Sequence, residues 1–115
     1  MIKRAEEMVR EIRENMRDGS GSVEILHIFQ GHELKGRARL CAKITLEPGC
    51  SIGFHHHDDE EEIFYIIRGK GIVDDDGNKV EVAAGDAVLT GGGRGHAIAN
   101  NGSESLEIMA VILTY

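Results

Sequence analysis

Short apolar segments separated by turn residues fill residues 23–115, and this pattern constrains the fold more than any other feature of the chain. Residues 39–47 show it most clearly, because apolar and polar side chains alternate there as on a β-strand with one buried face. The sequence DDGN at residues 75–78 is a strong turn signal between two such segments and predicts a hairpin. Further strands are predicted over residues 23–29, 63–67, 71–74, 79–82, 87–89, 96–100 and 106–113.

Short strands with frequent turns predict an all-β fold, either a sandwich or a barrel, over residues 23–115. A chain of 115 residues is long enough for one such domain and one core. The last predicted strand, residues 106–113, is apolar on both faces, although the wall of a barrel needs only one apolar face. A second sheet of the same domain or a second subunit would cover the other face, and we expect a homodimer.

Residues 1–22 form an N-terminal arm with a different composition. Apolar residues recur at near-helical spacing over residues 1–17, which predicts a helical or partly helical segment, with an extended arm as the alternative. Arginines and lysine alternate there with glutamates, as on a solvated, ion-paired face. The sequence GSGS at residues 19–22 is expected to end the helix and to act as a short flexible joint.

Charge and cysteine content restrict the partners and the compartment. The formal net charge of −7 argues against a nucleic acid or an anionic membrane as partner, since both attract basic surfaces. No apolar run is long enough to span a membrane, and the N-terminal residues lack the apolar stretch of a secretory signal. Cys41 and Cys50 have no CxxC spacing, so we expect reduced thiols and a cytoplasmic protein.

The run His55-His56-His57, followed by five acidic residues, is the segment richest in chemistry. On a strand, His55 and His57 share one face and His56 points away. His96 lies far enough along the chain to join them from a neighbouring strand, and either Glu61 or Glu62 could add a carboxylate. Three imidazoles and one carboxylate suit a divalent metal ion with open coordination positions. An exposed turn of solvated histidines and acids is the alternative. Of the acidic run itself, all members but one are expected to be solvated.

Two spaced motifs here resemble those of the cupin superfamily. The first motif is a glycine, His-x-His, a glutamate and a second glycine, matched by Gly49, His55, His57, Glu62 and Gly69. The second motif is matched by Gly85, Gly93, His96 and Asn100, with Gly91 where the family usually has proline. Fifteen residues separate Gly69 from Gly85, as in the small single-domain cupins.

The resemblance implies a small double-stranded β-helix, the jelly-roll barrel of cupins, over residues 23–115. It implies one divalent first-row metal ion per chain (Mn, Fe, Zn, Ni or Cu), held by His55, His57, Glu62 and His96. It also favours Glu62 over Glu61 as the inward carboxylate, with Phe64 and Ile66 lining the barrel. Asn100 is then expected to satisfy backbone groups rather than to bind metal.

Two functions remain open, because the cupin barrel supports many unrelated activities. The first is a metalloenzyme that acts on a small oxygenated substrate, such as a carboxylate, diketone or sugar derivative, by dioxygenase-like or isomerase-like chemistry. In that case Glu62 is the expected catalytic residue, leaving the metal or accepting a proton. The alternative is a cupin that binds a small ligand, such as a sugar, without catalysis. The polar residues without an assigned role are His27, His32, Arg39 and Tyr65.

Overall fold

The computed structural model describes residues 1–115 and is built almost entirely of β-strands. Three short 3₁₀ turns are the only helical elements: η1 (Ala5–Glu7), η2 (Met16–Asp18) and η3 (Gly31–Glu33). None of them could cross a lipid bilayer. The strands are β1 (Val9–Glu14), β2 (Ser22–Phe29), β3 (Ala38–Leu46), β4 (Ser51–His56), β5 (Glu60–Arg68), β6 (Lys70–Asp75), β7 (Asn78–Ala83), β8 (Ala87–Gly91), β9 (Gly95–Ala99) and β10 (Leu106–Thr114).

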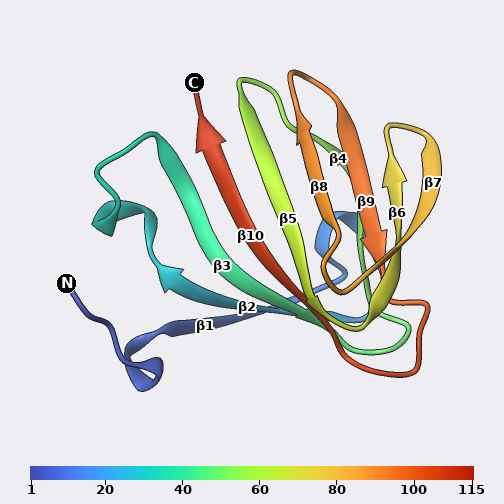
Figure 1. The fold of residues 1–115 in the computed structure, drawn as a ribbon, viewed down its shortest axis with the longest axis horizontal. Helices are drawn as coiled ribbons and strands as arrows, with labels where there is room; N and C mark the ends of the chain where they lie inside the picture. Colours follow the sequence, from blue (N-terminus) through green and yellow to red (C-terminus); the bar gives the residue numbers. More distant parts are fainter.

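The strands form two antiparallel sheets that together make a jelly-roll barrel (Figure 1). The larger sheet has the order β1-β2-β3-β10-β5-β8, and the smaller has the order β4-β9-β6-β7. The predicted all-β fold class is therefore confirmed. The predicted hairpin at residues 75–78 is also present, because β6 pairs with β7 and Gly77 adopts a φ of 97° in the turn between them.

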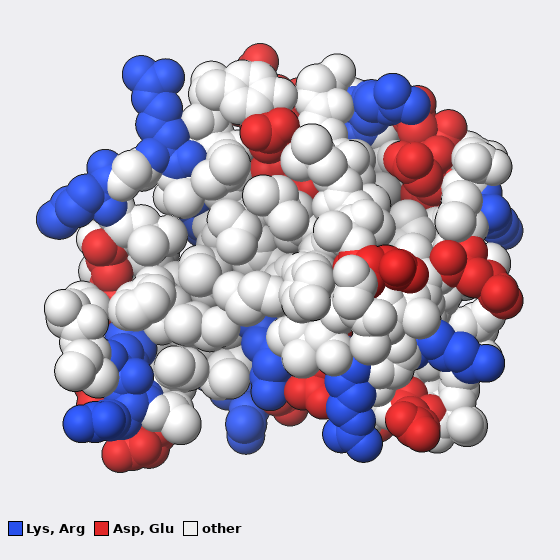
Figure 2. All heavy atoms as spheres, in the orientation of Figure 1, with Lys and Arg blue, Asp and Glu red and all other residues white.

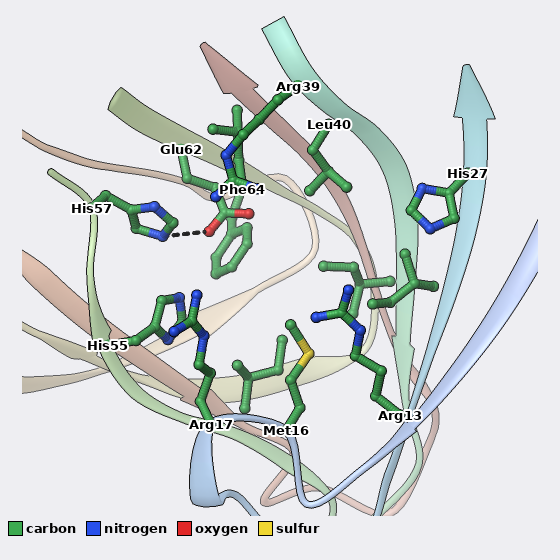
Figure 3. A pocket seen from close by; sticks show the side chains of 14 residues that line it. Arg13, Met16, Arg17, His27, Arg39, Leu40, His55, His57, Glu62 and Phe64 are labelled. Atoms are coloured by element: carbon green, nitrogen blue, oxygen red, sulfur yellow. Dashed lines mark ion pairs between the residues drawn. The ribbon is translucent and has the colours of Figure 1, made fainter. Parts of the chain in front are cut away.

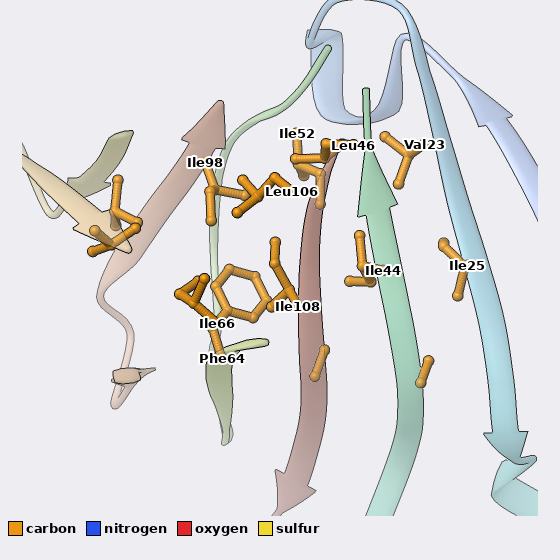
Figure 4. Close-up of a cluster of buried hydrophobic side chains, with 14 residues drawn as sticks. Val23, Ile25, Ile44, Leu46, Ile52, Phe64, Ile66, Ile98, Leu106 and Ile108 are labelled. Carbon is orange, nitrogen blue, oxygen red and sulfur yellow. The ribbon is translucent and has the colours of Figure 1, made fainter. Parts of the chain in front are cut away.

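The core lies between the two sheets and follows the alternation seen in the sequence (Figure 4). In β3 the side chains of Ala42, Ile44 and Leu46 are buried, whereas the residues between them are half-buried. In β5, Phe64 and Ile66 point into the barrel, as predicted from an inward Glu62. The other members of the core are Val23, Ile25, Ile52, Val73, Val82, Ile98, Leu106, Ile108 and Ala110.

Of the two forms expected for residues 1–17, the helical one is wrong and the extended one is present. Residues 9–14 form strand β1, which pairs with β2 from Val9 opposite His27 to Glu14 opposite Ser22. Without β1, the edge of β2 would leave its backbone donors and acceptors unpaired, and satisfying them outweighs a modest helical preference. Sequence spacing alone could not reveal that a free sheet edge would lie beside this segment.

The predicted flexible joint at residues 19–22 is also wrong, because this segment is bonded to the start of β4. The backbone N–H of Ser51 donates to the carbonyl oxygen of Ser20 at 2.8 Å, and the Ser20 hydroxyl donates to the carbonyl oxygen of Gly49 at 2.8 Å. The N–H of Ser20 in turn donates to the Ser51 hydroxyl at 2.9 Å. The arm is therefore fixed against the strand that carries the histidine run.

Asn100 has the structural role that was expected of it. Its side chain is 3% exposed, and its amide nitrogen donates to the carbonyl oxygens of Leu46 at 2.8 Å and Glu104 at 2.7 Å. Its amide oxygen accepts from the N–H of Gly102 at 2.9 Å. One buried amide thus joins the end of β3 to the loop between β9 and β10.

Replacing this amide should destabilise the fold. We expect Asn100→Ala to lower the free energy of unfolding by about 2 kcal/mol, because buried backbone groups lose their partners. Asn101→Ala is the matched control, since Asn101 is exposed, and it should change the value by less than about 0.5 kcal/mol. Urea unfolding of both variants measures the difference; equal effects would contradict the assigned role.

Candidate metal centre

Three strands bring the predicted ligands together inside the barrel. β4 pairs with β9 so that His55 lies opposite His96, while Glu62 comes from β5 in the other sheet. The register of the β4–β9 pair shifts between Ile52 and His55. Residues three apart on a regular strand face opposite ways, so this irregularity lets both Ile52 and His55 face the interior. The local backbone therefore helps to turn His55 towards the site.

His57 follows the end of β4 and is held by its own backbone. Its N–H donates to the carbonyl oxygen of Arg94 at 3.0 Å, and its carbonyl oxygen accepts from the N–H of Gly93 at 2.9 Å. His56, between the two inward histidines, is exposed, and its Nδ1 lies 3.1 Å from the carbonyl oxygen of Gly93. The inward and outward directions within the histidine run are thus those predicted from a strand.

His55, His57, Glu62 and His96 each offer one ligand atom, and these atoms lie within 4.8 Å of one another. Glu62 Oε1 is 3.0 Å from His57 Nε2 and 3.1 Å from His96 Nε2, and His96 Nε2 is 3.2 Å from His55 Nε2. His57, Glu62 and His96 are buried and His55 is half-buried. Figure 3 shows the imidazoles of His55 and His57 and the carboxylate of Glu62 turned towards a common space.

Hydrogen bonds on the outer nitrogen, Nδ1, of His55 and His57 favour a cation at the inner nitrogen, Nε2. His55 Nδ1 lies 2.8 Å from the carbonyl oxygen of Gly53, and His57 Nδ1 lies 2.5 Å from Glu60 Oε2. Both partners are acceptors, so each Nδ1 carries a proton and Nε2 of each ring faces the cluster. The contact with Glu62 raises the pKa of His57, and a bound cation would take the place of a proton on its Nε2. Two lone pairs and a carboxylate then converge, and a divalent cation fits such a donor set.

The cluster also sets the protonation of its members. Burial lowers the pKa of His55 to about 4, and the positive charge of Arg17 acts in the same direction. Burial raises the pKa of the Glu62 carboxyl, but hydrogen bonds with His57 and His96 outweigh it and hold that pKa below its usual value. Near neutral pH, His55 is therefore a neutral donor and Glu62 an anionic one.

Glu60 has a specific role that the sequence did not reveal. The acidic run was expected to be solvated apart from one member, yet Glu60 contacts His57 Nδ1 and accepts two hydrogen bonds from the Arg39 guanidinium, both at 2.8 Å. The Arg39 hydrogen bonds lower the pKa of Glu60 to about 2, and the contact with His57 adds to this effect. Arg39 and Glu60 therefore orient His57 from behind.

A small pocket opens beside the cluster, with a volume of about 80 Å³. Pockets for drug-sized ligands typically measure roughly 300–1,000 Å³, so this space suits a ligand of few atoms. Its wall combines apolar side chains such as Leu40 and Phe64 with three of the four candidate ligands (Figure 3). The remaining polar side chains are all basic or neutral nitrogen groups: Arg13, Arg17, Arg39 and His27.

Two of these pocket residues were assigned elsewhere from the sequence. Arg13 and Arg17 belong to the arm and were predicted to lie on a solvated, ion-paired face, but both line the pocket. Among the polar residues without a predicted role, Arg39 and His27 line it as well, whereas His32 and Tyr65 do not. Arg13 reaches the pocket because β1 pairs with β2, and Arg17 reaches it because η2 packs against Gly53 of β4.

Comparison with known proteins identifies relatives over the whole chain. The sequence profile of the cupin domain family matches residues 42–112. The oxalate-binding protein of Thermotoga maritima is 42% identical over 113 residues, which cover 98% of this chain and 93% of that protein.

Solved structures agree with this relationship. A crystal structure from Thermotoga maritima, described as a predicted oxalate decarboxylase, superposes with a TM-score of 0.94 at 41% identity and covers all of both chains. A polyketide cyclase from Streptomyces resistomycificus superposes with a TM-score of 0.78 over 99% of this chain and 80% of its own, but at 18% identity it supports the fold alone.

The two adjacent histidines allow a matched test of the cluster. We expect His57→Ala to lower the affinity for a divalent metal at least tenfold, because an inward donor is lost, whereas His56→Ala should retain the wild-type affinity. Metal content measured by mass spectrometry after dialysis against limiting zinc or manganese distinguishes the two variants. Equal losses would mean that the cluster is not where the metal binds.

Proposed function

Since the chain belongs to the cupin domain family, we propose that it binds one divalent first-row metal ion and holds a small dicarboxylate, of the size of oxalate, at that metal. His55, His57, Glu62 and His96 would hold the ion. The observation that carries the proposal is a small, basic pocket beside a cluster of inward metal donors. The name of the relative that is 42% identical supports the same ligand class.

The donor set fits the metal. Three imidazole nitrogens and one carboxylate provide nitrogen and oxygen ligands and only one negative charge. Such an ion, when bound, leaves coordination positions that carboxylate oxygens can take, and acts as a Lewis acid towards them. Phe64 stacks on His96 with the ring centroids 4.8 Å apart. This contact with a core residue holds the imidazole of His96 in its orientation.

Size and charge favour a dicarboxylate over a sugar. The pocket of about 80 Å³ has room for few atoms beyond those that contact the metal. Arginines lining it attract anions, and Glu62 is the only carboxylate in the wall. A divalent cation held by Glu62 and the histidines would more than offset the charge of that carboxylate.

A second candidate function is turnover of the bound dicarboxylate, and the position of His27 favours it. His27 lines the pocket, and its Nε2 lies 2.8 Å from Glu11 Oε1, an arrangement that can give or take a proton. Decarboxylation of hydrogen oxalate to formate and carbon dioxide replaces a carbon–carbon bond by a carbon–hydrogen bond and needs such a proton. Glu62, the catalytic residue expected from the sequence, would act in this candidate only.

Calorimetry tests the proposed binding. We expect protein loaded with manganese or zinc to bind about one oxalate per chain, and the metal-free protein to bind none, because the anion needs the metal. Acetate, with one carboxylate, and glucose, which is larger and neutral, serve as control ligands and should bind at least tenfold more weakly. Formate release under the same conditions would establish the second candidate; oxalate binding without metal would contradict the proposal.

The outer face of the larger sheet supports a homodimer, which we also propose. Tyr65 and Ile67 of β5 and Leu89 of β8 are 49%, 45% and 63% exposed, and register places Tyr65 beside Met109 of β10. Figure 2 shows mostly uncharged side chains where β10 and β5 run in Figure 1, with charged ones towards the edges. A second copy of this face would remove that apolar area from water.

A charge on this face should separate the subunits. We expect Leu89→Lys to give a monomer of 12.6 kDa and the wild-type chain to have twice that mass. Val80→Lys, at a 44% exposed position on the smaller sheet, is the control and should leave the dimer intact. Light scattering after size exclusion measures the masses; a monomeric wild-type protein would refute the dimer.

We further place the protein in the cytoplasm. Cys41 and Cys50 are both free thiols in the structure, and unpaired cysteines suit a reducing compartment.

A further inference from the structure

Three arginines line the pocket, and they differ in what already neutralises them. Arg39 is bound by both oxygens of Glu60 at 2.8 Å. Arg13 donates to Glu11 Oε2 at 2.7 Å. Arg17 has neither an ion pair nor a side-chain hydrogen bond within the chain, although it lies in the same pocket as His55 and Glu62. Its charge is therefore available to a ligand (Figure 3).

The backbone that carries Arg17 is held in an unfavourable conformation. Arg17 has φ 55° and ψ 36°, in the left-handed region, and Asn15, which precedes η2, and Asp18, its last residue, have φ of 50° and 64°. Side chains other than glycine rarely adopt this region, and residues that do so often lie at functional sites. The turn that orients Arg17 is thus kept despite its conformational cost.

Contacts with β4 hold this turn in place. A Cβ at Gly53 would lie 1.9 Å from the carbonyl oxygen of Arg17, so only glycine allows the turn to approach so closely. The carbonyl oxygen of Gly53 also accepts the hydrogen bond from His55 Nδ1. Gly53 therefore contacts both the turn that carries Arg17 and a metal-binding candidate, which ties the position of one to the other.

We propose that Arg17 is the anion-recognition residue of the pocket and binds one of the two carboxylates of the ligand. This inference rests on the proposed function and adds to it the residue that selects a charged ligand. The guanidinium offers a planar pair of N–H donors, which matches a carboxylate in a bidentate way. The arm, rather than the barrel alone, then completes the ligand site.

Arg17→Gly separates recognition from structure. Glycine adopts φ 55° without strain, so a purely structural role of residue 17 predicts a variant of unchanged or higher melting temperature and unchanged binding. We expect the melting temperature and the zinc content to be retained but the affinity for oxalate to fall at least tenfold. Arg17→Gln, which keeps a long polar side chain, should lower the affinity for oxalate by a similar factor. Arg10→Gln is the control, because Arg10 pairs with Glu24 outside the pocket.

The outcomes separate this inference from the proposed function. Calorimetric titration of the zinc-loaded proteins with oxalate supplies the measurement. Tight binding by the wild type with equal binding by both Arg17 variants would overturn the role of Arg17 and leave the proposed function standing. A zinc-loaded wild type that binds no oxalate would overturn both. If the Arg17 variants lost zinc as well as the ability to bind oxalate, the proposal that Arg17 acts on the anion alone would also be refuted.

Discussion

The pairing of β4 with β9 is the contact on which the rest of the site depends. It places His55 opposite His96, and the irregularity before His55 allows Ile52 to enter the core while the imidazole faces the cluster. β5 then supplies Glu62 from the opposite sheet, so the cluster spans the barrel and not one wall. The two antiparallel sheets therefore enclose the core and also position the four candidate metal ligands.

The environment behind each imidazole is as specific as the donors themselves. A backbone carbonyl holds His55, the Arg39–Glu60 pair holds His57, and the ring of Phe64 packs on His96. Each of the three rings is thus oriented by a different kind of contact. A mutation in one of these supports would change the direction of a ring without removing a donor.

The barrel and its cluster could be predicted from the sequence because they depend on regular features. Strand alternation places His55 and His57 on one face, and the spacing from Glu62 to Gly69 follows a family pattern. The arm could not be predicted, since its strand forms only where the edge of β2 is available. Glu60 was missed for a related reason: nothing in a run of five acids shows which one will meet Arg39 across the sheet.

Strand β1 forms one border of the larger sheet, and its composition suits that position. An outermost strand presents unpaired backbone groups that invite other chains to add strands and form aggregates. Arg10, Glu11, Arg13 and Glu14 give β1 a charge at four of its six positions, and these charges oppose the pairing of further chains with this strand. The strand that brings Arg13 to the pocket thus also protects the protein at high concentration, where an uncharged border would promote fibre formation.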